Sequence, residues 1–225
     1  MSDSSADFAE PSGTGRGAVG PLLIACLLTL LGVLAYSAFP RYTMRFDEPV
    51  QSWPWLAGAM AVFAAWVWPM GRWGGSPWRG ALAEALMLAL AGAAVAVPAV
   101  WWTGASRTQV AAAGVYVLTW LAASMLAIAS AGRPGRGVVL WVYAAVMTLA
   151  NWGLLAGAYF ADDLLDVVSA GWLRWCPMAQ SARLAETGWP IRGNQADWLA
   201  FVTPVGVVLI LLATAMLGRR ADRST

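Results

Sequence analysis

Long runs of apolar residues with almost no charge constrain the fold of this chain more than any other feature. Several of these runs approach 20 residues. Because a helix rises about 1.5 Å per residue, about 20 residues cross the roughly 30 Å hydrocarbon core of a bilayer. Charged residues make up only 12% of the 225 residues, too few to cover a water-exposed surface. The pattern predicts an all-α, polytopic bundle of membrane-spanning helices.

Six spans account for the apolar runs. We expect them at residues 18–39, 53–70, 79–102, 109–131, 137–161 and 197–217. They form one transmembrane domain, residues 18–217, between a disordered polar tail, residues 1–17, and a short tail, residues 218–225. The first apolar run, Pro21 to Phe39, exceeds the usual length of the apolar region within a signal peptide and follows a single arginine, so an uncleaved first span is favoured over a cleaved leader.

The arginine positions orient the predicted spans. The arginines of the 2–3 loop, the 4–5 loop and the C-terminal tail far outnumber the acidic residues there: Arg72, Arg79, Arg133, Arg136, Arg219, Arg220 and Arg223. The loops on the opposite side mix both signs of charge. Since basic residues concentrate on the cytoplasmic side, both termini are expected to be cytoplasmic.

Missing residue types exclude several kinds of chemistry. The chain has no histidine, and all 14 basic residues are arginine. Imidazole-ligated metals, Ser-His or Cys-His pairs and lysine nucleophiles are therefore excluded. We predict no catalytic residue, no metal site and no cofactor, and the net charge of +2 gives no reason to expect nucleic acid as a partner. Asp162, Asp163 and Asp166 are better explained as the solvated face of a helix than as metal ligands.

Fifteen tryptophans are an unusual number for a chain of this length. Many fall at the predicted span ends, where an indole prefers the headgroup region, so anchoring belts are the favoured interpretation. Trp66, Trp120 and Trp152 lie deeper within the spans. They are the candidates for the alternative, a ligand site lined by tryptophan.

Three residues of the fifth span are candidates for helix packing. Gly153 and Gly157 form a G-x-x-x-G motif, which allows another helix backbone to approach closely. The partner helix is either internal or in a second subunit, so a homodimer or a larger membrane complex is compatible with the motif. Asn151 is expected to form a hydrogen bond between helices rather than to bind a ligand.

Glu84 is the candidate for a polar contact inside the membrane. It follows Arg79 by five residues in the third span, about 7 Å from the cytoplasmic edge. An unpaired carboxylate at depth is costly. The carboxylate is expected either to reach the interface or to pair with Arg72 or Arg79; a contact with a proton or a substrate is the alternative.

The long segment between the fifth and sixth spans predicts two short helices on the exoplasmic side. Apolar residues at helical spacing form one face of the first helix, which is suited to lie in the membrane interface: Leu164, Leu165, Val168, Trp172 and Trp175. Pro177 can begin the second helix, and Gly188 and Pro190 can end it.

Taken with these features, the chain resembles the permease subunits of ABC-2-type exporters. The similar stretches are Trp175-Cys176-Pro177-Met178-Ala179 leading into Arg183-Leu184, and the last span from Asp197-Trp198-Leu199 to Gly218-Arg219-Arg220. The resemblance implies a multi-pass protein of the inner or plasma membrane. It also implies a dimer that works with a separate nucleotide-binding ATPase. A non-catalytic anchor or assembly subunit of a larger membrane complex is the alternative, and a membrane-embedded enzyme or small-molecule channel is a third.

Overall fold

The computed structural model describes most of the chain beyond the first predicted span. The described residues are 52–72, 76–132, 137–153, 174–190 and 195–224, together with positions 24, 27, 28 and 31. Within these ranges all regular structure is helical and no strand occurs. The predicted all-α class is therefore confirmed for this part of the chain.

Five long helical stretches and one short helix make up the described structure. The first stretch is α3 (Ser52–Val62), the π-helical segment η1 (Phe63–Val67) and α4 (Trp68–Met70). It is followed by α5 (Trp78–Thr103) and α6 (Arg107–Ala131). Next come α7 (Gly137–Thr148) with the π-helical segment η2 (Leu149–Gly153), the short helix α10 (Pro177–Thr187), and α11 (Gln195–Ser224).

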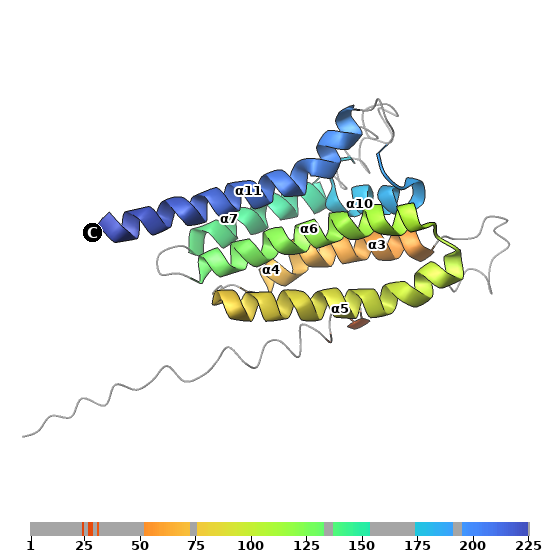
Figure 1. Cartoon of the computed structure of the whole chain (residues 1–225), viewed down its shortest axis with the longest axis horizontal. Coiled ribbons are helices and arrows are strands. Elements are labelled where there is room, and N and C mark those ends of the chain that lie inside the picture. Colours follow the sequence, from red (N-terminus) through yellow and green to blue (C-terminus); the bar gives the residue numbers. More distant parts are fainter. Residues whose placement is uncertain are drawn as a thin grey trace, which may run out of the picture.

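The long helices lie side by side, with α10 across one end of the bundle (Figure 1). The α3–η1–α4 stretch and α6 occupy the middle, while α5 and α11 lie on opposite outer sides. The segments that join α4 to α5 and α6 to α7 share one end, where the Ser76 N–H donates to the Ile128 carbonyl at 3.2 Å. The α5–α6 turn and α10 share the other end, where Gly188 approaches Thr108.

Local sequence signals explain where several helices begin and end. The Ser106 hydroxyl accepts a hydrogen bond from the Gln109 N–H, and the Gln109 side chain accepts one from the Ser106 N–H, so a capping box begins α6. Gly104, with a φ of 64°, ends α5, and Gly188, with a φ of 79°, ends α10. Since positive φ is costly for residues with a Cβ, glycine is the residue these ends require.

Apolar side chains face outward along much of the bundle. Among the described residues, three helices are long and apolar enough to cross a membrane, at Trp78–Trp101, Arg107–Ala131 and Gln195–Met216, and Gly137–Trp152 is a shorter apolar helix. Leu90 of α5 and Leu209 and Ile210 of α11 are among the large apolar residues left exposed. Water would disfavour so much contiguous apolar surface. Length, composition and exposure together indicate a membrane protein.

The observed bounds differ from the predicted spans mainly near the chain ends. The α3–α4 stretch, α5 and α6 begin and end within two residues of the ranges 53–70, 79–102 and 109–131. The last helix instead continues to Ser224, through most of the segment expected to be a tail. The tail at residues 1–17, nearly all of the first span and residues 154–161 of the fifth lie outside the described residues.

Candidate functional site

A buried carboxylate joins the α4 end of the first stretch to α5. Glu84 is 4% exposed, and its Oε2 accepts hydrogen bonds from Trp68 Nε1 at 3.0 Å and from Arg72 Nε at 2.9 Å. Its other oxygen, Oε1, forms an ion pair with the Arg72 guanidinium. Of the two arginines that the sequence leaves open as partners, the structure places Arg72 on Glu84 and leaves Arg79 exposed.

The geometry of this pair suits a low-dielectric environment. Arg72 presents two nitrogens to the two carboxylate oxygens, and this forked arrangement is the strong form of an arginine–carboxylate contact. The Glu84 side chain is buried, at 5% exposed, and the Arg72 side chain is largely buried, at 10% exposed. Because the indole N–H of Trp68 adds a third donor, the negative charge of Glu84 is well satisfied. A structural joint between helices is the role this arrangement fits best.

A second polar network depends on Pro69. The Trp68 N–H donates to the carbonyl of Phe63, five residues earlier, which is the π-helical register. In that register the next donor would be the N–H of residue 69, but proline has none. The Ala64 carbonyl is therefore free to accept the Ser124 hydroxyl of α6 at 2.6 Å.

Tyr143 of α7 completes this network. Its hydroxyl lies 2.9 Å from Ser124 Oγ. A serine hydroxyl carries one hydrogen, and Ser124 gives it to Ala64, so Tyr143 must be the donor between the two hydroxyls. A chain of hydrogen bonds thus joins three helical stretches inside the apolar core.

At the opposite end, α10 packs closely on α3. The Ser181 hydroxyl donates to the Ala57 carbonyl at 2.9 Å, and both residues are fully buried. Next to this bond, a Cβ built on Gly58 would lie 3.2 Å from the Met178 carbonyl oxygen, so the glycine permits the close approach. A backbone-to-backbone contact of this kind fixes α10 firmly against the bundle.

Asp197, in the first turn of α11, forms ion pairs with two arginines at this same end. Arg183 of α10 approaches both of its carboxylate oxygens, at 3.0 Å from NH1 to Oδ1 and 3.1 Å from NH2 to Oδ2. Arg174 Nε lies 3.5 Å from Oδ1. The sequence alone does not bring these three residues together. The available signal was an aspartate directly before an apolar run, where its charge also suits a helix N-terminus.

The packing candidates of the fifth span fall at the edge of the described region. The Asn151 amide donates to the Met147 carbonyl of its own helix at 2.9 Å, and its Oδ1 has no hydrogen-bond partner among the described residues. The expected hydrogen bond to another helix is therefore not formed by the described part of the chain. Gly153 ends η2, and Gly157 lies outside the described residues.

The second of the two short helices predicted before the last span is present as α10, which begins at Pro177 as expected. Of the predicted first helix, only the end is described. Trp175 lies in a turn and is 46% exposed. The other members of its apolar face, and the three aspartates of its polar face, lie outside the described residues: Asp162, Asp163, Leu164, Leu165, Asp166, Val168 and Trp172.

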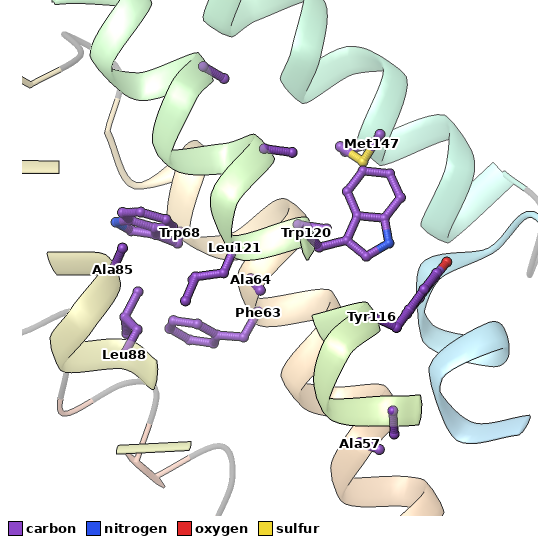
Figure 2. Packing of buried hydrophobic residues seen from close by; sticks show 14 of the residues in the cluster. Ala57, Phe63, Ala64, Trp68, Ala85, Leu88, Tyr116, Trp120, Leu121 and Met147 are labelled. Carbon is purple, nitrogen blue, oxygen red and sulfur yellow. The ribbon is translucent and has the colours of Figure 1, made fainter. Parts of the chain in front are cut away.

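The three deep tryptophans do not form one cluster: Trp66 and Trp152 contact each other, and Trp120 lies in a different contact. Trp66 of η1 and Trp152 of η2 meet edge to face, with ring centroids 5.7 Å apart, and Trp66 Nε1 donates to Thr148 Oγ1 at 2.8 Å. Trp120 instead packs edge to face on Tyr116 of its own helix, at 6.3 Å. In Figure 2, Trp120 and Tyr116 point away from the group formed by Phe63, Leu88 and Leu121.

A cavity lies between α3–η1, α5 and α6. Its volume is about 230 Å³, and its lining is almost entirely apolar. Phe63, Leu88 and Leu121 converge on it from the three helices (Figure 2). Half of the lining residues are alanine or glycine, including Gly92 and Gly114. Within the described residues, no group of three or more Cys, Asp or Glu side chains could hold a metal ion.

These features define an α-helical membrane protein with ion pairs near both ends of the bundle and an apolar cavity between three of its helices. Comparison with known proteins adds no closer assignment, because no family model, no curated protein and no solved structure matches this chain.

Proposed function

We propose that this chain is the membrane-spanning permease subunit of an ABC-2-type exporter in the inner or plasma membrane, with both termini cytoplasmic. The observation that carries the proposal is the order of the last elements. A short helix, α10, lies directly before the last long apolar helix and packs back onto α3. Such a short helix before the final span is part of the resemblance to these permeases.

The energy source would reside in a partner. A phosphate-binding loop of the common type needs a lysine, and the chain contains none. ATP hydrolysis is therefore assigned to a separate nucleotide-binding subunit that docks at the cytoplasmic end. Transport would then depend on movements of that subunit reaching the helices of this chain.

The Glu84–Arg72–Trp68 joint supports a permease that works with a separate ATPase. It lies at the end of the bundle that the arginine pattern assigns to the cytoplasm, and it ties the end of α4 to the start of α5. At the same end, a Cβ built on Gly132 would lie only 2.6 Å from the Ser76 carbonyl oxygen. The α4–α5 connection and the end of α6 would thus move together when a partner pushes on either.

The test is site-specific crosslinking to the partner in native membranes. A photo-crosslinking amino acid is placed at Arg79 or, as the matched control, at Arg107. Both arginines are exposed in the first turns of neighbouring helices, but they lie at opposite ends of the bundle. We expect a P-loop ATPase to be crosslinked from position 79 and not from position 107.

Two results would count against the proposal. Failure to recover a P-loop ATPase from either position would remove the exporter assignment. Crosslinking to membrane proteins of another kind would favour the alternative, a non-catalytic anchor or assembly subunit of a larger complex.

A further inference from the structure

We propose that the cavity between α3–η1, α5 and α6 binds one acyl chain of a membrane lipid, with the lipid's ester carbonyl accepting a hydrogen bond from Trp53. This inference does not depend on the permease assignment. It rests on the shape and lining of the cavity, on the Trp53 indole N–H at one end, which has no partner among the described residues, and on the lipid that surrounds the bundle.

The cavity is large enough for a ligand and unsuited to water. Its volume is about 230 Å³, whereas an apolar cavity of about 150 Å³ already binds benzene and stays free of water. Much of the wall consists of alanine and glycine. A Cβ built on Gly114 would meet no atom within 4 Å, so the protein's own side chains leave this space open.

The cavity runs along the bundle rather than across it. Its lining extends from Trp53 to Ala64 on one stretch and from Val110 to Leu121 on α6. Each of these segments spans eleven residue steps, which is about 16 Å of helix. An elongated apolar space of this kind fits a hydrocarbon chain better than a compact ligand.

Trp53 supplies the polar end. It lies in the first turn of α3, lines the cavity and is 4% exposed, yet its Nε1 has no hydrogen-bond partner among the described residues. A buried N–H without an acceptor is costly. Because this position is the start of a predicted span, it would lie near the depth of the ester groups, which are hydrogen-bond acceptors.

Lipid is also the occupant available at the highest concentration. α5 forms one wall of the cavity with Leu88, Ala89 and Gly92, while Leu86 and Leu90 of the same helix face outward and are 57% and 70% exposed. On the α6 side of this wall, Leu118 also lines the cavity and is 54% exposed, so the cavity is partly open to the surrounding hydrocarbon beside α5. A chain that enters beside α5 exchanges one apolar environment for another and gains the contact with Trp53.

The proposal is tested in vesicles of dioleoylphosphatidylcholine with a trace of the same lipid carrying a diazirine in the middle of one acyl chain. After illumination, mass spectrometry compares labelling of Met60, which lines the cavity, with labelling of the outward-facing Leu90. We expect both to be labelled in the wild-type protein. Gly114→Leu fills the cavity and should lower the Met60-to-Leu90 ratio at least fivefold.

Gly206→Leu is the matched control. A Cβ at Gly206 also meets nothing within 4 Å, but this glycine is in α11 and does not line the cavity, so the ratio should stay within twofold of the wild type. Trp53→Phe keeps an aromatic ring and removes only the donor. It should lower the ratio about fivefold, the effect expected from losing one hydrogen bond.

Several outcomes would overturn the proposal. These are an unlabelled Met60 in the wild-type protein, labelling that Gly114→Leu leaves unchanged, and labelling that Trp53→Phe leaves unchanged. A photo-crosslinking amino acid in place of Met60, which already has a long side chain in the cavity wall, gives an independent check. If it joined residues 18–39 of the same chain instead of lipid, a segment of the protein would be the occupant.

Discussion

At the scale of single residues, most of the polar groups that organise this bundle are satisfied by partners far away in the sequence. The sequence could place Glu84 inside the membrane and offer two arginines, because composition and depth decide that much. It could not choose between them, since the choice depends on the rotation of α4 relative to α5. Ser124 and Tyr143 gave no signal at all, because their roles follow from the change of helical register before Pro69.

Replacing Glu84 by glutamine should destabilise the protein by about 3 kcal/mol, because it leaves the Arg72 charge buried without a counter-charge. The free energy of unfolding can be measured by titration with a denaturing detergent, followed by tryptophan fluorescence. The double variant Glu84→Met/Arg72→Met removes both charges and should recover most of the loss. Arg79→Gln, at an exposed arginine of the same helix, should change stability by less than about 0.5 kcal/mol.

A Glu84→Gln variant as stable as the wild type would show that Arg72 is solvated in the membrane and that the joint contributes little.

At the scale of elements, the sequence predicted helix positions better than helix contacts. The bounds of α5 and α6 follow from apolar length, from glycine and from a capping box, all of which are local signals. The start of α10 at Pro177 is equally local. Its position against α3 could not be predicted, because that contact joins Ala57 and Ser181 across 124 residues. Neither π-helical segment was predicted either.

Displacing α10 should expose Cys176. This thiol is fully buried at the start of α10, and burial raises its pKa. Since a raised pKa means less thiolate at any pH below it, Cys176 should react slowly with maleimide, and its rate should keep rising at pH values where a free thiol has levelled off. Gly58→Val places extra atoms against the Met178 carbonyl and should raise the rate about tenfold, in a Cys26→Ser background.

Gly114→Val, where the added atoms meet open space, is the control and should leave the rate of Cys176 unchanged. Equal rates in the two variants would mean that α10 is not fixed by the contact at Gly58.

At the scale of the whole molecule, the described helices alternate in direction along the chain, and their ends carry different charges. The end that contains the α4–α5 and α6–α7 connections bears arginines, whereas the α10 end mixes Arg174, Arg183 and Asp197. The number of spans and their sidedness remain predictions from composition and arginine counting. Orientation in a membrane depends on the charges of the loops and not on the packing of helices inside the bundle.

Sidedness can be measured with single cysteines in a cysteine-free background. With Arg107→Cys, a membrane-impermeant maleimide should label intact cells. With Arg79→Cys, labelling should require permeabilised cells. Both side chains are exposed, so access rather than burial decides the result. The opposite pattern would place the termini outside and invert the proposed docking end.

The π-helical segment η1, Phe63–Val67, takes one more residue per turn than an α-helix, and this widening sets the direction in which the side chains after it face. Each residue turns an α-helix by about 100°, so an added residue re-aims the downstream side chains by roughly that angle. Trp68 and Arg72 both follow the widening and both reach Glu84. Winding Phe63–Val67 as a regular α-helix without removing a residue would swing these two side chains a quarter-turn or more away from α5, whereas deleting Ala65 would remove the extra residue and leave them facing Glu84. The irregular turn is thus the element that points the two donors at their acceptor.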